Sequence, residues 1–217
     1  RSIINKKKIR KKNKTKFLKI GTSCNVNPDK NIGFLIKVAR ILKKENLDIM
    51  FLIAGNIYNS QLKYFKSLKE IIKKENLNNI KFLGYKKDIN NFLKNLNLYC
   101  CFSERESSPL SIWEAMHFGL PIITTDVGDL KYHLNKGKFG YLIKNFDENI
   151  YANKIKKILN NKNIYEKFSN ASFNYSQKVF NQDNNFRKAL KFIFSNKKFI
   201  DNKKIKLSTG NLNLGKP

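Results

Sequence analysis

The sequence predicts an α/β protein built on a doubly wound parallel sheet. Short apolar segments of strand length alternate along the chain with segments in which apolar residues recur at helical spacing. The strand-like segments are apolar almost throughout, which is typical of strands that helices cover on both faces. Because strands alternate with helices, parallel pairing with helical crossovers is the favoured arrangement.

The elements follow one another in a regular order. Strands are expected at FLKIGT (17–22), DIMFLIAG (48–55), NIKFLG (79–84), LNLYCCF (96–102), PIITT (121–125) and YLI (141–143). Helices are expected at 31–45, 60–75, 88–95, 110–118 and 127–134, and a helical pattern runs from 147 to about 195. In doubly wound sheets, ligands bind beyond the carboxyl ends of the strands. The polar loops after the first four strands are therefore expected to hold the site.

The chain is expected to divide into four segments. Residues 1–16 form a basic lead with little to bury, and residues 17–180 form the α/β domain. Residues 181–195 are expected to be a separate C-terminal helix, and the polar tail 196–217 is expected to be disordered.

The net charge of +28 is extreme for a chain of 217 residues. It is compatible with three interpretations: a Lys- and Asn-rich compositional bias, attraction to anionic lipid or phosphorylated substrates, or nucleic-acid binding. Lysine is spread along the whole chain and arginine, the preferred reader of bases and phosphates, is scarce. A compositional bias is therefore the favoured explanation of the net charge, and nucleic-acid binding is the least favoured.

The location in the cell is predicted from two features. No run of about 18 apolar residues is present, so no transmembrane helix is expected. Cys24, Cys100 and Cys101 have neither metal-site nor disulfide spacing, which favours reduced thiols in a cytosolic protein. Cys100 and Cys101 are adjacent in an expected strand, so their side chains should point to opposite faces of the sheet.

The segment 102–128, FSERESSPLSIWEAMHFGLPIITTDVG, is the most informative part of the chain. Ser108 is a natural helix N-cap, and Pro109 suits the first helical position. The backbone N–H groups of Leu110 and Ser111 would then point out of the helix start. Together with the helix dipole they predict an anion site suited to phosphate or diphosphate.

Two carboxylates flank this helix start. Glu114 lies one turn after Leu110 on the same side of the helix, where it could accept hydrogen bonds from a ribose. Glu106 precedes the helix at the tip of the strand, where a sugar would sit. The alternative is that Glu106 and Glu114 are solvated acids paired with the abundant lysines, and Glu104 fits that alternative best.

The spacing Glu106-x7-Glu114, followed by EAMHFGLPIITTDVG, resembles the retaining glycosyltransferases of family 4. The resemblance runs from about 17 to 190 and includes IAGN, IKFLGY and KGKFGYLIKNFDE. It implies the C-terminal, Rossmann-like half of a two-domain GT-B fold, with residues 17–180 binding a nucleotide-diphosphate sugar. It also implies that the N-terminal, acceptor-binding half is absent, so that the chain is a fragment, a split-gene half or a degenerate relative.

The resemblance assigns roles to individual residues. Glu114 matches the glutamate that holds the nucleotide ribose, and Glu106 matches the glutamate near the donor sugar. Lys30 matches the lysine on the donor diphosphate, where its charge would stabilise the leaving group. The base would rest against the loop at Gly84 and Tyr85. The resemblance implies no metal and no cofactor, and a UDP- or GDP-sugar as donor substrate.

The chain departs from the family pattern at two positions. Asn25 stands where the family carries an arginine on the diphosphate, and a neutral amide cannot form a bidentate phosphate clamp. Ser107 replaces a glycine, which narrows the allowed backbone geometry. Both departures put the affinity for the sugar donor, rather than the fold, in question.

The resemblance leaves the C-terminal helix open to two interpretations. The segment 182–195 matches a helix that crosses onto the N-terminal half in the family. Its apolar face is either exposed here or packed on its own domain. The two histidines suggest no hydrolase triad: His117 is expected to pack and His133 to face solvent.

The sequence therefore suggests a glycosyltransferase donor domain that serves a glycan or lipid-linked acceptor in surface polysaccharide synthesis. It would be cytoplasmic, with possible peripheral attachment to the anionic inner face of the cell membrane. The alternatives are a non-catalytic GT-B binding module that needs a separate N-terminal half, and a charge-driven nucleic-acid binder.

Overall fold

The computed structural model describes residues 17–179, apart from the side chains of residues 135–137. The basic lead (1–16), the expected C-terminal helix (181–195) and the tail (196–217) lie outside the described residues. The boundaries of these segments therefore remain predictions.

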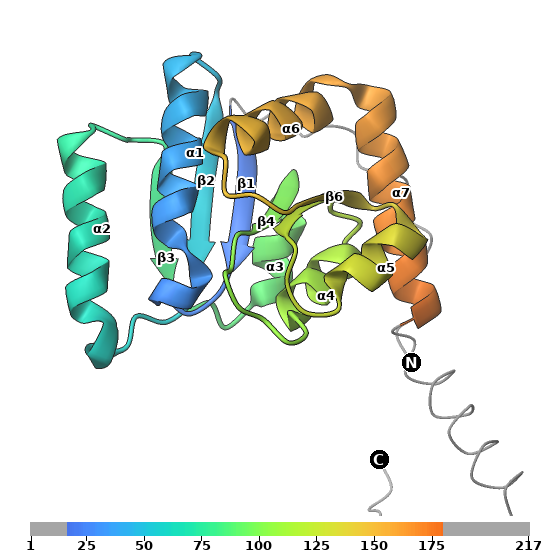
Figure 1. Ribbon diagram of the computed structural model, residues 1–217, viewed down its shortest axis with the longest axis horizontal. Coiled ribbons are helices and arrows are strands. Elements are labelled where there is room, and N and C mark those ends of the chain that lie inside the picture. The colour runs from blue at the N-terminus through green and yellow to red at the C-terminus, as the bar shows by residue number, and fades with distance from the viewer. Residues whose placement is uncertain (1–16, 180–217) are drawn as a thin grey trace, which may run out of the picture. The chain divides into compact units, whose positions relative to one another are not determined.

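The described chain is built around a parallel sheet of six strands (Figure 1). The strands are β1 (Leu18–Ser23), β2 (Ile49–Ala54), β3 (Ile80–Gly84), β4 (Leu98–Cys101), β5 (Ile122–Thr125) and β6 (Gly140–Ile143). Their order across the sheet is β3-β2-β1-β4-β5-β6. The chain thus builds outward from β1 in one direction, then returns to β4 on the other side of β1. The boundary between β1 and β4 is the topological switch point of the sheet.

Helices cover both faces, which confirms the doubly wound α/β prediction. One core cluster joins the sheet to α1 (Ile32–Lys44), α2 (Leu62–Lys74) and α6 (Glu148–Asn160). The other joins it to α3 (Ile89–Lys94), α4 (Leu110–His117) and α5 (Leu130–Gly137). Residues of α7 (Lys162–Val179) pack against both clusters. Figure 1 shows α7 running along the β6 side of the sheet.

Alternate strand residues feed the two clusters. Cys100 belongs to the α1 side and Cys101 to the α3 side, so the prediction that these thiols point to opposite faces is confirmed. All four residues of β4 and all four of β5 are buried. Burial on both faces explains why these strands are apolar throughout rather than alternating.

The predicted continuous helix from 147 onward is wrong at one point. The chain breaks between α6 and α7 at Asn161, which has an extended backbone (φ −115°, ψ 104°). The side-chain Oδ1 of Asn161 then accepts a hydrogen bond from the Ile164 N–H at 3.0 Å, and so caps the start of α7. The break lets the second helix change direction and pack along the edge of the sheet.

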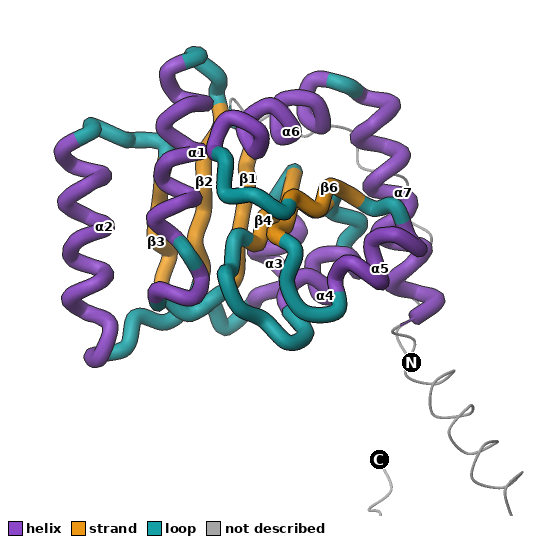
Figure 2. Tube along the Cα trace, in the orientation of Figure 1, coloured by secondary structure: helices purple, strands orange, loops and turns teal. Residues whose placement is uncertain are grey.

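The loops after β1, β2, β3 and β4 lie at the same edge of the sheet, at the bottom of the view in Figure 2. Hydrogen bonds join the first three of them. The Val26 N–H donates to Asn56 O at 2.9 Å, and the Gly55 N–H donates to Gly84 O at 2.9 Å. None of the described helices combines the length and apolarity that a membrane span requires.

Candidate nucleotide-sugar site

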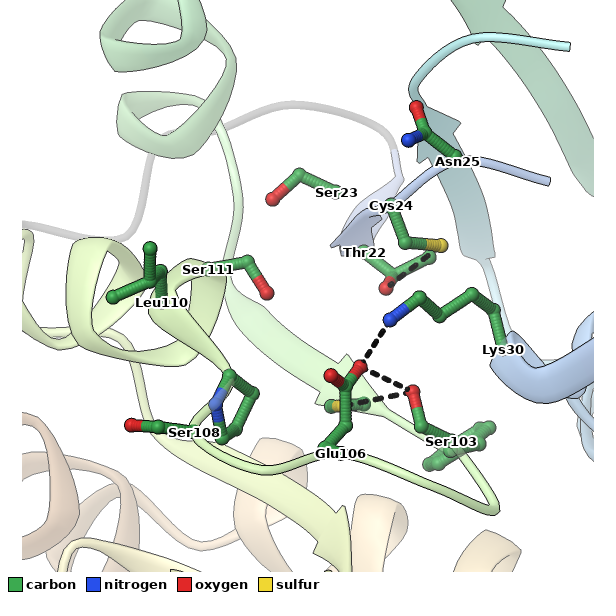
Figure 3. A pocket seen from close by; sticks show the side chains of 13 residues that line it. Thr22, Ser23, Cys24, Asn25, Lys30, Ser103, Glu106, Ser108, Leu110 and Ser111 are labelled. Atoms are coloured by element: carbon green, nitrogen blue, oxygen red, sulfur yellow. Dashed lines mark hydrogen bonds and ion pairs between the residues drawn. The ribbon is translucent and has the colours of Figure 1, made fainter. Parts of the chain in front are cut away.

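A polar pocket of about 290 Å³ opens at the carboxyl ends of β1 and β4, at the switch point of the sheet (Figure 3). Its walls are the loop after β1, the loop after β4 and the start of α4. The lining residues are Thr22, Ser23, Cys24, Asn25, Lys30, Cys101, Phe102, Ser103, Glu106, Ser108, Pro109, Leu110 and Ser111. Two loops that are nearly 80 residues apart in sequence therefore form one site.

The loop after β1 presents Lys30 to this pocket. Val26 is buried and anchors the loop, while the side chain of Asn27 accepts a hydrogen bond from the Lys30 N–H at 3.2 Å. That bond caps the short 3-10 turn Pro28–Lys30, so Lys30 leaves the loop from an ordered turn. Its side chain is only 22% exposed.

Lys30 forms an ion pair with Glu106 across the pocket (Figure 3). The Glu106 side chain is 17% exposed, and its Oε1 also accepts a hydrogen bond from the Ser103 hydroxyl at 2.9 Å. The structure thus brings together the two residues expected to act on the diphosphate and the sugar. A partly desolvated ammonium and carboxylate interact more strongly than an exposed pair, and each fixes the position of the other.

The loop after β4 is held by the turn that follows β5. The Thr125 hydroxyl donates to Ser103 O at 2.6 Å. Gly128 has a φ of +57°, and a Cβ at this position would collide with the carbonyl oxygen of Ser107 and lie 2.9 Å from Glu106 O. A glycine at this close approach lets the backbone that carries Glu106 rest directly on the turn.

The start of α4 differs by one residue from the prediction. Pro109, with extended backbone angles (φ −77°, ψ 90°), is the cap residue, and the first helical residue is Leu110. Ser108 is therefore not the N-cap, and no side chain caps this helix. The Ser108 hydroxyl instead donates to Asp129 Oδ2 at 3.2 Å and accepts from Trp113 Nε1 at 3.1 Å.

The two residues predicted to bind an anion still stand at the helix start despite this shift. Leu110 and Ser111 are the first two residues of α4, and both line the pocket. The first N–H groups of a helix have no partner within the helix, and the helix dipole gives that end a partial positive charge. The helix start and the Lys30 ammonium therefore both contribute positive potential to the pocket.

The other predicted site residues lie at or beyond its rim. Asn25 lines the pocket, but its Oδ1 accepts a hydrogen bond from the Asn56 N–H at 3.3 Å and so links two loops. Glu114 is exposed on α4 outside the pocket lining, and partial desolvation raises the pKa of its carboxyl. Gly84, the last residue of β3, and Tyr85, which follows it, also lie outside the lining, with Tyr85 69% exposed. Exposed Glu104 is likewise not part of the lining.

Several residues of the pocket lining were not predicted from the sequence. Cys24 lines the pocket, and burial raises the pKa of its thiol to about 12, so it is a neutral wall group at neutral pH. Ser23 is held by buried Tyr99, whose hydroxyl accepts from the Ser23 N–H at 2.9 Å. Residues on β1 and β4 meet here because the strands are adjacent, which no local pattern reveals.

The predictions for the two histidines were wrong. His117 is exposed and its Nδ1 lies 3.2 Å from Gln177 Nε2. His133 is only 16% exposed, its Nδ1 lies 2.8 Å from the Tyr175 hydroxyl, and its ring packs against Trp113. Neither lines the pocket. Among the described residues, no group of three or more His, Cys, Asp or Glu side chains is arranged to hold a metal ion.

Comparison with known proteins identifies the family. The sequence model of the family described as glycosyl transferases group 1 matches residues 3–175. The chain belongs to this family. Among curated members, it is 30% identical over 170 residues to the poly(ribitol-phosphate) alpha-N-acetylglucosaminyltransferase of Staphylococcus aureus, covering 70% of this chain and 33% of that protein.

A second curated relative is the UDP-Gal:alpha-D-GlcNAc-diphosphoundecaprenol alpha-1,3-galactosyltransferase of Escherichia coli. It is 29% identical over 138 residues, which cover 62% of this chain and 35% of that protein. The chain thus spans about a third of the length of these two relatives.

Comparison with solved structures confirms the fold as that of a GT-B C-terminal domain. The C-terminal domain of LpcC from Francisella tularensis superposes with a TM-score of 0.67 at 22% identity, covering 75% of this chain and 86% of that one. Anabaena HepE bound to UDP and glucose superposes with a TM-score of 0.72 at 20% identity, and the match covers 81% of this chain and 48% of HepE. A mutant of S. aureus TarM, in complex with fondaparinux, alpha-GlcNAc-glycerol and UDP, superposes with a TM-score of 0.69 at 26% identity. This match covers 80% of this chain and 35% of TarM.

Proposed function

We propose that this chain is the donor-binding half of a retaining glycosyltransferase of family 4, and that its pocket holds the diphosphate of a UDP- or GDP-sugar. The observation that carries the proposal is the convergence of Lys30, Glu106 and the start of α4 on one pocket at the switch point of the sheet. Ligands of doubly wound sheets bind at this place. Supporting it, TarM, at 26% identity, was crystallised with UDP.

The diphosphate would lie between Lys30 and the N–H groups of Leu110 and Ser111. A diphosphate carries its charge on exposed oxygens, and an ammonium beside a helix start stabilises such charge with little reorganisation. As the bond between sugar and diphosphate breaks, negative charge builds on the leaving diphosphate. Lys30 would then interact more strongly with the leaving group than with the intact donor, and that difference accelerates the reaction.

The sugar and the nucleoside would extend from opposite ends of the diphosphate. Glu106, held by Lys30 and Ser103, would face the sugar. Glu114 would accept hydrogen bonds from the ribose hydroxyls, and the base would lie against Gly84 and Tyr85. In this arrangement Lys30 and the helix start take the part that a divalent ion plays in other transferases, so the proposal needs neither a metal nor a cofactor.

The acceptor would be a glycan or a lipid-linked glycan, bound by an N-terminal GT-B half, in surface polysaccharide synthesis. The names of the two curated relatives support this class, since one acts on poly(ribitol-phosphate) and the other on a diphosphoundecaprenol-linked sugar. A cytoplasmic location at the inner membrane face would suit such an acceptor. The net charge of +28 favours attraction to anionic lipid there.

Calorimetry with UDP, UDP-sugars and GDP-sugars tests the site. We expect Lys30→Ala to weaken binding of the preferred nucleotide about 30- to 100-fold, because it removes a charge-assisted phosphate contact. Lys156→Ala is the matched control, since Lys156 is also paired with a glutamate, Glu45, at 2.8 Å, and does not line the pocket. No nucleotide binding to the wild-type chain, or equal losses in the two variants, would contradict the proposal.

One observation favours a second candidate, a binding module of the same fold without turnover. Asn25 stands at the position where the family carries an arginine. Its side chain is a neutral amide, and the amide oxygen already accepts a hydrogen bond from the Asn56 N–H. If the chain is such a module, it binds nucleotide but hydrolyses no sugar nucleotide, even when a complementary N-terminal half is added. An active enzyme shows hydrolysis or transfer in that mixture, and we expect Asn25→Arg to tighten UDP binding.

A further inference from the structure

Asp129 stands where an aspartate usually caps a helix, yet its side chain serves another purpose. It is the N-cap residue of α5, but its carboxylate makes no hydrogen bond to the N–H groups of that helix. Asp147, the N-cap of α6, behaves in the usual way: its Oδ1 accepts from the N–H groups of Asn149 at 2.8 Å and Ile150 at 3.2 Å. The side chain of Asp129 thus forgoes the local bond that stabilises a helix start.

The carboxylate of Asp129 instead reaches the loop that lines the pocket. Its Oδ2 accepts a hydrogen bond from the Ser108 hydroxyl at 3.2 Å, and that hydroxyl accepts from Trp113 Nε1 at 3.1 Å. The direction of both hydrogen bonds is fixed, because an indole N–H group can only donate and an ionised carboxylate can only accept. Ser108 is therefore held from both sides, and Ser108 is a lining residue of the pocket.

A second partner fixes Asp129 itself. His133 Nε2 lies 3.3 Å from Asp129 Oδ2, and His133 Nδ1 lies 2.8 Å from the Tyr175 hydroxyl. If the Nε2–H donates to the carboxylate, Nδ1 accepts from the tyrosine, so the network assigns one tautomer to the ring. The network runs from α7 through α5 to the pocket loop.

The backbone around Asp129 supports the same loop. The Asp129 N–H donates to Ser107 O at 3.3 Å, and Gly128 lies directly against the carbonyl groups of Glu106 and Ser107. The Asp129 side chain is 41% exposed, but its Oδ1 is buried and has no hydrogen-bond partner among the described residues. The hydrogen bonds of Asp129 are therefore made through Oδ2 and the backbone N–H, both toward the loop or its support.

We propose that Asp129 is a positioning residue of the pocket: through Ser108 and Ser107 it fixes the segment that carries Glu106 and the start of α4. It touches no reacting atom, and it acts by holding the loop in the geometry in which Glu106 meets Lys30. Its effect on the sugar donor rests on the proposed function, whereas its effect on the loop does not.

The loop effect is measured without any ligand. Trp113 is the only tryptophan of the chain, so its indole N–H gives a single, self-identifying resonance in a ¹H–¹⁵N spectrum of the full chain. We expect Asp129→Ala to move this resonance and those of the amides from Glu106 to Ser111. Asp129→Asn, which keeps an acceptor oxygen, should move them less. Asp147→Ala removes a true helix cap and should leave them unchanged.

A double-mutant cycle then tests the link to the ligand. Asp129→Ala and Ser108→Ala should each weaken UDP binding, the former about tenfold. Because the proposed effect passes through Ser108, the double variant should bind UDP only slightly more weakly than whichever single variant has the lower UDP affinity. Asp147→Ala, which lowers stability by loss of its cap, should leave UDP affinity unchanged.

Each result decides a separate question. An unmoved indole resonance in folded Asp129→Ala, or additive effects in the cycle, overturns the positioning role. If Asp129→Ala does not fold, Asp129→Ser decides in the same way, because serine is a favoured helix N-cap but its side chain is too short to replace the carboxylate that reaches Ser108. A wild-type chain that binds no UDP contradicts the proposed function, while the ligand-free spectra still support or overturn the role of Asp129.

Discussion

The loop after β4 and the loop after β3 lie at the same edge of the sheet but are built in opposite ways. The loop after β4 is fastened to the end of β5 by the Thr125 hydroxyl, and to the turn after β5 by the close approach of Gly128 to Ser107. β3 ends at Gly84, where no described atom lies within 4 Å of an added Cβ, and the loop after it begins with Tyr85, which is 69% exposed. One loop is supported by the neighbouring end of β5 and the turn after it, and the other is open.

In terms of the proposed function, this difference separates two tasks. The supported loop would hold the diphosphate and the sugar, where charge develops and where a small displacement is costly. The open loop would meet the base, where contact area matters more than exact placement. A preorganised anion site avoids an ordering cost on binding, while an open surface orders only when the nucleoside arrives.

A pair of glycine substitutions tests the structural difference directly. Gly128 and Gly84 both have positive φ values, +57° and +65°, so alanine is strained at each position. At Gly84 the strain is the only penalty, and we expect a loss of about 1 kcal/mol in the free energy of unfolding. At Gly128 the new Cβ also meets the Ser107 carbonyl, and we expect about 3 kcal/mol.

Urea unfolding of Gly84→Ala and Gly128→Ala measures both losses under the same conditions. The common backbone strain cancels in the comparison, which leaves the collision with the loop after β4. Equal losses would mean that the loop moves aside at little cost. In that case the description of this loop as firmly supported is wrong.

The sequence predicted where both loops lie, at the carboxyl ends of two strands. It did not reveal that one loop is supported and the other is open. Strands, and the order in which they occur, are evident from apolar runs, because burial on both faces demands them. Glu106 was singled out by its place before the helix start, and Lys30 through a family resemblance. Their contact depends on the adjacency of β1 and β4, which is a property of the whole sheet.

The errors of prediction have the same physical origin. Ser108 and Pro109 fit a local capping pattern, yet the serine hydroxyl is taken by Asp129, 21 residues further along the chain. His133 looks like a surface residue in its helix, but α7 packs a tyrosine against it. The break at Asn161 is a single residue in an otherwise helical pattern. In each case a tertiary contact or a side-chain cap overrides the local signal.

Ligand dissection sharpens the comparison on the functional side. If the base rests on Tyr85, Tyr85→Ala should weaken UDP binding about fivefold, because an exposed aromatic contact is lost. Binding of inorganic pyrophosphate, which has no base, should not change. Lys30→Ala should weaken both ligands, because its charge acts on the phosphates. Calorimetry of the two variants with the two ligands gives the four values required.

The outcome separates the two ends of the site. A loss of pyrophosphate affinity in Tyr85→Ala would place this residue at the phosphates, or show that the open loop supports the pocket. Unchanged UDP binding in Tyr85→Ala would show that the base does not contact Tyr85 in the loop after β3. Either result would break the assignment of one task to each loop.

The smallest expected effect concerns Glu114, between the two ends of the proposed ligand. Desolvation raises the pKa of this carboxyl above its value in the unfolded chain. As pH rises, the unfolded chain therefore loses this proton first, and Glu114 lowers the stability of the fold through the window between the two pKa values. A ribose hydroxyl donates to the ionised form, so UDP affinity should rise as the pH rises through the raised pKa of Glu114 in the folded chain.

Glu114→Gln should remove this component of the pH dependence, both from unfolding and from UDP binding. Glu70→Gln, at an exposed position of α2, is the control and should leave both profiles as in the wild type. If Glu114→Gln binds UDP as the wild type does at every pH, the ribose contact is wrong and Glu114 is a surface acid. Since pyrophosphate has no ribose, its binding should not depend on Glu114, and this separates ribose recognition from a change in the charge of the pocket.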